Sequence, residues 1–273
     1  MIYDILMNQS MKKIIVIVSC IYFFLGTTFT ADAATVRPKI RVGLYQTTQP
    51  ITITVNGKSE VQSHSVATDT VITLSYDPTA TTYTASVEDW STTSLLPIVV
   101  DPVKKNKVAT ITSYSNSPDW NTSLNDNQFY GAIELNEDWV VNELGIENYV
   151  KGVAEAGNDN KPAYLKALYT AARTYVYFLY LYPTKHAGEP YLVDTTPNDQ
   201  VYRGYGFTNR APNIVAAVDA TAGQIVTYNG EVVVTPYFSQ SDGRTRAWSE
   251  VWSGDYPYLQ SVDDPCCTGE ELL

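Results

Sequence analysis

One carboxylate, Glu155, has the setting in this sequence that best suits acid chemistry. It lies in the run 152–157, Gly-Val-Ala-Glu-Ala-Gly, whose other members are small or apolar. Partial burial disfavours the charged form of a carboxyl group and raises its pKa, which is the condition for a general acid near neutral pH. A carboxylate in solvent, or one paired with Lys151 or Arg173, is the simpler interpretation, and the pattern alone favours it.

Other kinds of catalytic site have little support in the sequence. It contains no phosphate-binding glycine loop, no HExxH motif and no GxSxG motif. Its 273 residues include two His and three Cys, which is too few for a zinc site built on several His. The stretch 239–243 is small and polar enough to line a pocket, although such a stretch is more often a turn. With 18 Lys and Arg against 29 Asp and Glu, the net charge of -11 argues against a nucleic-acid partner.

One long helix is predicted to begin shortly after Glu155. Asn160 can cap its free N–H groups, Pro162 is tolerated in the first turn, and Pro183 ends the pattern. Apolar residues recur between them at helical spacing, on a stripe about 120° wide that a helix would bury against a core. They are Leu165, Leu168, Tyr169, Ala172, Val176 and Leu179. A polar flank beside this stripe carries Lys166, Thr170, Arg173 and Tyr177.

The remaining sequence is typical of strands and turns. Residues 34–127 are rich in Thr, Ser, Val and Tyr, with alternating stretches at 51–55 and 83–87. Asn229-Gly230 between two apolar runs is the strongest hairpin signal. We therefore predict an α+β fold, mostly β with one long helix. In it, residues 34–127 form an N-terminal β-rich lobe or insertion, and residues 128–273 form the core.

The first 33 residues are interpreted as a signal peptide whose true start is Met11. Two Lys residues follow Met11, then an apolar run that includes Cys20, then an Ala-Asp-Ala cleavage site ending at Ala33. We expect a secreted or envelope-associated protein. An uncleaved membrane anchor is the less favoured alternative, because the apolar run is shorter than the ~20 residues of a spanning helix. The adjacent Cys266 and Cys267 are interpreted as ordinary thiols.

Further motifs occur in a fixed order around Glu155. The run Tyr149 to Glu155 is followed by Leu-Lys-Ala at 165–167 and Ala-Ala-Arg-Thr-Tyr at 171–175. Gln-Val-Tyr at 200–202 and Tyr-Phe at 237–238 come later. Together these motifs resemble the signature of the stage II sporulation protein D and amidase enhancer (LytB) family. The resemblance extends over nearly the whole chain after the signal peptide.

The resemblance implies a secreted lytic transglycosylase that cuts the MurNAc–GlcNAc backbone of peptidoglycan, preferring strands without stem peptides. It implies Glu155 as the single acid and base, and Arg173 as a group that holds substrate or orients Glu155. A structural ion pair is an equal alternative for Arg173. The substrate-binding residues that it implies are Gln200, Tyr202, Ser239, Ser241, Lys166 and Tyr177. No metal or diffusible cofactor is implied.

The same resemblance also allows an alternative function. The protein would then bind the cell wall and enhance an N-acetylmuramoyl-L-alanine amidase without catalysis of its own. Ala156-Gly157 replaces the family's usual Met-Pro, and Asn160-Lys161 replaces its Trp-Pro, which favours this alternative. Val193 and Asp199 stand where some relatives have zinc-binding Cys, so we expect no zinc. Ser239 replaces a His of the family. Relatives usually continue past the point where this sequence ends, so a shortened C-terminal part is expected.

Overall fold

The computed structural model of the chain describes residues 38–264. The predicted signal peptide and all three Cys residues lie outside these residues. Among the helices of the described part, none has the length and apolar character needed to cross a membrane.

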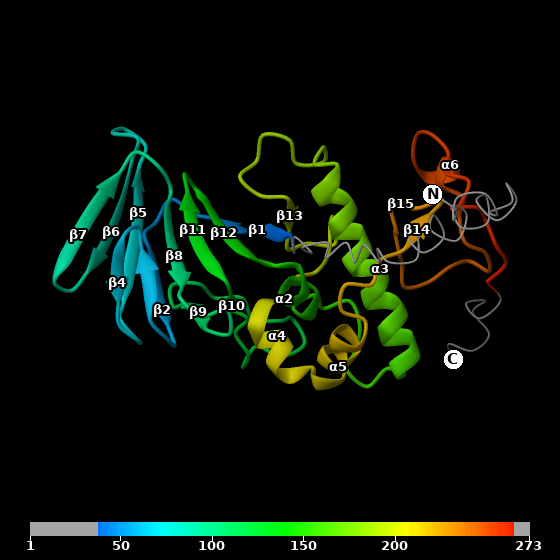
Figure 1. The fold of residues 1–273 in the computed structure, drawn as a ribbon, viewed down its shortest axis with the longest axis horizontal. Coiled ribbons are helices and arrows are strands. Elements are labelled where there is room, and N and C mark those ends of the chain that lie inside the picture. Colours follow the sequence, from blue (N-terminus) through cyan, green and yellow to red (C-terminus); the bar gives the residue numbers. More distant parts are fainter. Residues whose placement is uncertain (1–37, 265–273) are drawn as a thin grey trace, which may run out of the picture. The chain divides into compact units, whose positions relative to one another are not determined.

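A seven-stranded mixed sheet includes strands from both halves of the described chain (Figure 1). Its strand order is β13-β1-β12-β11-β8-β3-β4, and the pairing is antiparallel except between β1 and β13. Its strands are β1 (Lys39–Gln46), β3 (Ser59–Val61), β4 (His64–Val66), β8 (Ile98–Pro102), β11 (Ala132–Asn136), β12 (Trp139–Gly145) and β13 (Val193–Asp194).

A second, six-stranded antiparallel sheet has the order β10-β9-β2-β5-β6-β7. Its strands are β2 (Ile51–Val55), β5 (Ile72–Asp77), β6 (Thr82–Val87), β7 (Trp90–Ser94), β9 (Val108–Ile111) and β10 (Gln128–Tyr130). The strands β2 and β8 alternate buried and less buried side chains, and both sheets contribute to one hydrophobic core, for example through Ile53 and Val100. Because β10 pairs with β9 and β11 pairs with β8, strands after residue 127 complete sheets that begin before it.

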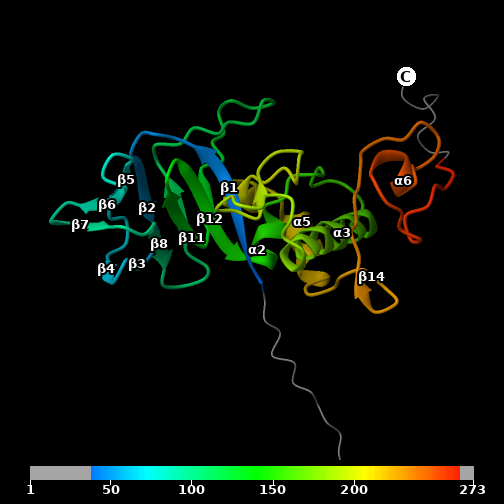
Figure 2. The same ribbon diagram turned by 90° about the horizontal axis from the view of Figure 1, so that it is seen from above.

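The helices follow the last long strand. They are α2 (Ile146–Lys151), α3 (Pro162–Leu181), α4 (Gly204–Arg210), α5 (Pro212–Ala220) and the short α6 (Trp248–Val251). The first four of them pack on one another, with α2 beside β1 and β12 (Figure 2). The predicted α+β fold, mostly β with one long helix, is confirmed.

The predicted long helix corresponds to α3, and its apolar stripe packs into the core. Five of the six stripe residues are buried, and the sixth, Leu168, is half-buried. The predicted cap was wrong. The N-cap residue is Lys161, without a side-chain hydrogen bond, because the Asn160 amide instead donates to the carbonyl of Gly157 at 3.0 Å.

The predicted hairpin is also present. Strands β14 (Thr227–Tyr228) and β15 (Glu231–Val232) pair antiparallel around Asn229 and Gly230. These two turn residues have φ angles of 51° and 85°, the left-handed conformation that Asn and Gly adopt most readily in a two-residue turn.

Candidate active site

Glu155 is positioned by a short pairing between two segments that are far apart in the sequence. After α2, Val153 forms an antiparallel bridge with Tyr202. The N–H of Ala154 donates to the carbonyl of Val201 at 2.7 Å, next to this bridge. Gly152 permits the close approach, because a Cβ there would lie 2.5 Å from Cε2 of Tyr202. The bridge therefore brings Glu155 beside the Gln-Val-Tyr motif.

The Glu155 carboxylate is half-buried and held by one backbone donor. Its Oε1 accepts a hydrogen bond from the N–H of Val201 at 2.7 Å. The two cations that the sequence offered as partners pair elsewhere, Lys151 with Asp219 and Arg173 with Glu147. Within residues 38–264, no ion pair involves Glu155. The carboxylate is therefore fixed in position without a compensating cation.

Two tyrosines lie close enough to Glu155 for its negative charge to raise the pKa of their hydroxyls. Burial raises the pKa of the Tyr237 hydroxyl, and the negative charge of Glu155 raises this pKa further. Burial also raises the pKa of Tyr169, with smaller contributions from Tyr237 and Glu155. Both hydroxyls therefore stay protonated at neutral pH. Tyr169 donates its proton to the carbonyl of Val153 at 2.9 Å, which fastens α3 to the segment that carries Glu155.

Gln200 was predicted to contact sugar, and the structure corrects this prediction. Its side chain is completely buried. The amide accepts a hydrogen bond from Tyr149 at 3.0 Å, and donates to the carbonyl of Ala172 at 3.3 Å and to the Tyr237 hydroxyl at 3.0 Å. Gln200 thus orients Tyr237. Because the Tyr237 oxygen accepts this bond, its own proton is left for another acceptor.

Tyr202 is likewise part of the core and not of a sugar surface. Its hydroxyl donates to Oδ1 of Asn142 at 2.9 Å, and its ring stacks on Tyr149 with centroids 5.1 Å apart. With 2% of its surface exposed, it has no area to offer a substrate.

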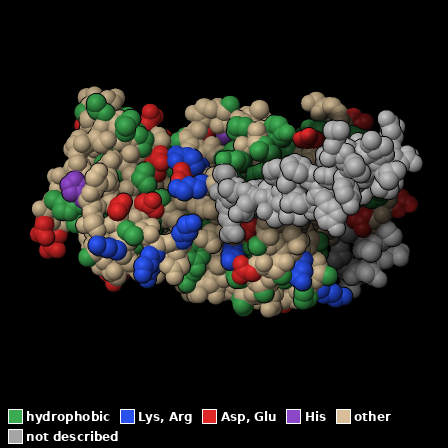
Figure 3. Space-filling model, viewed as in Figure 1, with side chains coloured by type: hydrophobic (Ala, Val, Ile, Leu, Met, Phe, Trp, Pro, Cys, Tyr) green, Lys and Arg blue, Asp and Glu red, His purple; other side chains and the backbone are tan. Residues whose placement is uncertain are grey.

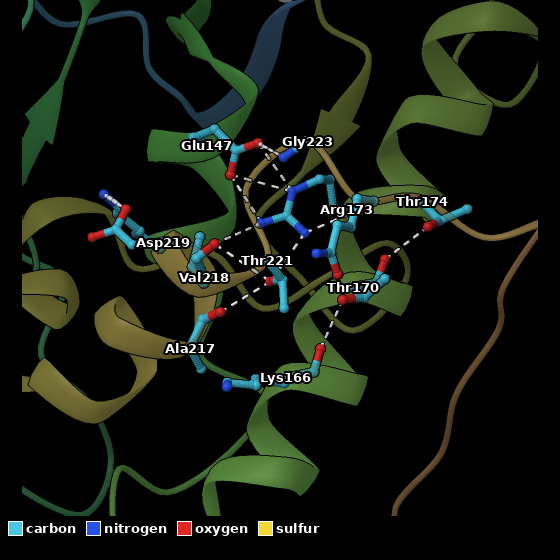
Figure 4. A network of polar contacts seen from close by, with 12 residues as sticks. Glu147, Lys166, Thr170, Arg173, Thr174, Ala217, Val218, Asp219, Thr221 and Gly223 are labelled. Carbon is cyan, nitrogen blue, oxygen red and sulfur yellow. Dashed lines mark hydrogen bonds and ion pairs between the residues drawn. The ribbon is translucent and has the colours of Figure 1, made fainter.

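Arg173 forms the structural ion pair that the sequence left open as an alternative (Figure 4). The guanidinium is 1% exposed and donates to Glu147 of α2, with Nη2 and Oε2 2.9 Å apart. It also donates to the carbonyls of Val218 and Gln224 at 3.1 and 3.3 Å, and to the Thr221 hydroxyl at 3.4 Å. Arg173 therefore does not contact Glu155, and the predicted contact with substrate is corrected as well. Its guanidinium N–H groups donate to α2, to α5 and to the chain after α5.

The other predicted site residues lie in different surroundings. Lys166 and Ser239 are exposed, and Ser239 follows Tyr237 by two residues. Tyr177 is half-buried and stacks with Tyr180, with their centroids 6.2 Å apart. The Ser241 hydroxyl donates to Asp264 at 2.8 Å. Of these residues, Lys166 and Ser239 remain open to a ligand.

Sequence reasoning did not assign Tyr237 and Tyr169 to the site. Tyr169 was placed only on the apolar stripe of α3, and Tyr237 only in a matching Tyr-Phe pair. Tyr237 could have been found from its position, because it lies two residues before the predicted Ser239, where the polar stretch 239–243 begins.

One group of side chains has the composition of a metal site. Ligand atoms of His186, Asp194 and Asp199 lie within 4.8 Å of one another. In this structure Asp199 accepts from Lys185 at 2.7 Å and lies 2.7 Å from Nε2 of His186. The carboxylate is thus already engaged with cationic or hydrogen-bonding partners. The expected absence of zinc here stays a prediction.

The structure also contains a cavity of about 540 Å³ near the α3 ion pair, lined by Lys39, Glu143 and Glu147 among others. Glu155 is not one of its lining residues. A ligand at Glu155 would therefore lie on the surface between the 152–157 segment and Tyr237, and not in this cavity.

Part of the chain that builds the site matches a known family. Residues 135–228, which include α2, Glu155, α3 and the Gln-Val-Tyr motif, match the family model described as Stage II sporulation protein. This match confirms the resemblance inferred from the sequence.

Two of three individual relatives carry names related to this family. Stage II sporulation protein D of Bacillus subtilis (strain 168) is 34% identical over 137 residues, which cover 46% of this chain and 40% of that protein. The amidase enhancer of the same organism is 38% identical over 100 residues, 37% of this chain and 12% of that protein. An uncharacterized protein of Brachyspira hyodysenteriae is 37% identical over 155 residues, 54% of this chain and 41% of that protein. The chain thus spans about two fifths of the length of the Brachyspira protein and of Stage II sporulation protein D.

Proposed function

We propose that this protein acts in the bacterial cell wall as a lytic transglycosylase that cleaves MurNAc–GlcNAc linkages in peptidoglycan strands stripped of stem peptides. The observation that carries the proposal is Glu155, a half-buried carboxylate fixed by the Val201 N–H, without a cation, beside two protonated tyrosines. The names of the matched relatives, Stage II sporulation protein D and amidase enhancer, support a role at the cell wall.

A single carboxyl group is sufficient for lytic cleavage, whereas most glycosidases that use water need two. Protonated Glu155 gives its proton to the glycosidic oxygen as the bond from this oxygen to the anomeric carbon breaks. The Glu155 carboxylate then takes the proton of the sugar's own 6-hydroxyl, whose oxygen closes on the anomeric carbon. The product is a 1,6-anhydro sugar, and Glu155 ends protonated as it began. The reaction requires no metal or diffusible cofactor.

Neighbouring residues have supporting roles in this proposal. Tyr237 is positioned by Gln200, and its free proton is available to a sugar oxygen or to Glu155. Lys166 and Ser239, both exposed, are the predicted residues still able to contact the glycan. The net charge of -11 fits a substrate held by stacking and hydrogen bonds and not by charge attraction. We place the protein outside the cytoplasm, secreted or attached to the envelope.

The decisive experiment incubates the full chain with amidase-treated glycan strands and searches for anhydro ends by mass spectrometry. The variant Glu155→Gln keeps the size of the side chain and an acceptor for the Val201 N–H but has no acidic proton. We expect it to release no anhydro ends. The matched control is Glu189→Gln, an exposed carboxylate elsewhere, which should behave as the wild type. Equal release by the wild type and Glu155→Gln would remove Glu155 as the acid.

A second candidate function is a wall-binding enhancer of a cell-wall amidase, without cleavage of its own. Two observations favour it. Arg173 and Gln200, which a catalytic role would direct at substrate, are buried in the core, and Ala156-Gly157 replaces the family's Met-Pro beside Glu155. In that case neither the wild type nor Glu155→Gln would release anhydro ends, but the wild type would raise the rate of an added N-acetylmuramoyl-L-alanine amidase.

A further inference from the structure

The chain after Tyr237 folds into a closed loop whose two ends are held together. Arg244 forms an antiparallel bridge with Asp263, and the N–H of Thr245 donates to the carbonyl of Val262 at 2.8 Å. Inside the loop, the N–H of Trp248 at the start of α6 donates to the carbonyl of Leu259 at 2.9 Å. The loop therefore has a defined shape that can present side chains in a fixed arrangement.

Four aromatic residues of this loop and one from the β14–β15 hairpin form a continuous row of rings, which we call the aromatic strip. Its members, in order, are Trp252, Trp248, Tyr256, Tyr258 and Tyr228, and the centroids of neighbours are 4.4, 4.9, 5.2 and 5.3 Å apart. The two end rings are strongly exposed, Trp252 at 49% and Tyr228 at 42%. Single exposed aromatic residues are ordinary, but a row in mutual contact is characteristic of a binding surface.

The charges around the strip select among the ligands that stack on aromatic rings. Sites that stack nucleic-acid bases combine the rings with a positively charged groove. Here Arg244 is paired with Glu250, Arg246 is paired with Asp242, and Asp255 lies within the loop. Figure 3 shows that Lys and Arg side chains on the visible part of the β-rich half lie among Asp and Glu side chains. The strip therefore suits a ligand that is held by apolar faces and polar edges and not by charge attraction, such as a chain of pyranose sugars.

One ring of the strip lies near the segment that leads to Tyr237. The Tyr258 hydroxyl lies against the backbone of Val234, which lowers a pKa that burial otherwise raises. Val234 precedes Tyr237 by three residues, which span at most about 10 Å when extended. This short segment is anchored to α3, because the Thr235 hydroxyl donates to the carbonyl of Ala171 at 2.7 Å. Tyr258, the fourth ring of the row, therefore lies near the short segment that leads to Tyr237, and Trp252 forms one outer end of the row.

We propose that the aromatic strip is a glycan-binding platform, which holds a β-linked amino-sugar strand by stacking on the faces of its sugar rings and leads it toward Glu155. The identity of the glycan rests on the proposed function, whereas the strip itself stands on its own geometry. Apart from Tyr228, its members lie outside the matched region 135–228.

The test measures binding of the full chain to soluble, amidase-treated glycan strands by isothermal titration calorimetry, in the Glu155→Gln background to prevent cleavage. Trp252→Ala and Tyr228→Ala each remove one exposed ring and should weaken binding about threefold to tenfold. Trp252→Phe keeps a stacking face and should restore most of the affinity. The matched control is Trp120→Ala, which removes a Trp that is 71% exposed on the loop between β9 and β10 and should not change binding.

The outcomes separate the platform from the catalytic proposal. Unchanged affinity in both Trp252→Ala and Tyr228→Ala, an equal loss in Trp120→Ala, or no binding by the parent protein would overturn the platform. Binding that depends on the strip in a wild-type chain that releases no anhydro ends would support the platform and reject cleavage by Glu155. Circular dichroism of each variant checks that the loss does not come from unfolding.

Discussion

The contrast between the two roles considered for Arg173 gives the sharpest prediction. Replacing Arg173 by Met removes the charge and six hydrogen-bond contacts but retains most of the buried volume. Loss of one partner from a buried ion pair costs about 3–5 kcal/mol, because the other charge is left without compensation. Glu147 is 20% exposed and keeps the Gly223 N–H at 2.9 Å, so we expect a value near the lower end, about 3 kcal/mol.

Urea unfolding followed by circular dichroism measures this effect. With a denaturant slope of about 2–3 kcal/mol per molar urea, a loss of about 3 kcal/mol lowers the midpoint by about 1–1.5 M. Arg173→Met combined with Glu147→Met should recover part of the loss, because it replaces the pair by two apolar side chains. The control Arg244→Met breaks an exposed pair and should leave the midpoint unchanged. An unchanged midpoint in Arg173→Met, together with lost release of anhydro ends, would refute the structural role and restore the substrate contact.

Three other variants test local features of the structure. Burial raises the pKa of Glu143, but Lys39 and Arg41 lower it more, so that the pKa lies below the ordinary value of 4.5. The charged carboxylate therefore stabilises the fold above that pH, and this stabilisation is lost as the pH falls. The urea midpoint of Glu143→Gln should fall less on acidification than that of the wild type. Gln200→Ala removes the hydrogen-bond partner that Gln200 gives to the Tyr149 and Tyr237 hydroxyls, and it should reduce the free energy of unfolding by about 1–3 kcal/mol. Any release of anhydro ends should also fall, because Tyr237 is no longer held in position by Gln200. Gly152→Ala should destabilise by about 1–3 kcal/mol in thermal unfolding because of the Tyr202 ring, whereas Gly145→Ala, with no atom within 4 Å of the new Cβ, should be tolerated.

Local patterns predicted several elements correctly because their physical cause is also local. The apolar stripe of α3 follows from helical periodicity, and the hairpin at Asn229 and Gly230 follows from two residues that accept positive φ. The setting of Glu155 among small residues was also visible, and Gly152 is the position where the short contact with Tyr202 requires such a residue. The cap at Asn160 was missed because the side chain found a nearer carbonyl, that of Gly157.

Residue types and spacing thus determined by themselves the class of fold and the long helix, whereas Glu155 as the single acid was implied by the family resemblance. Only the tertiary structure decided which groups surround Glu155, because they arrive from distant parts of the chain. The Val201 donor is 46 residues away, and Tyr237 is held by Gln200 from 37 residues away. The same long-range packing buried Arg173 against Glu147 and so removed it from the site. A one-dimensional pattern shows which face of a helix is polar, but the partner of that face depends on how the elements pack.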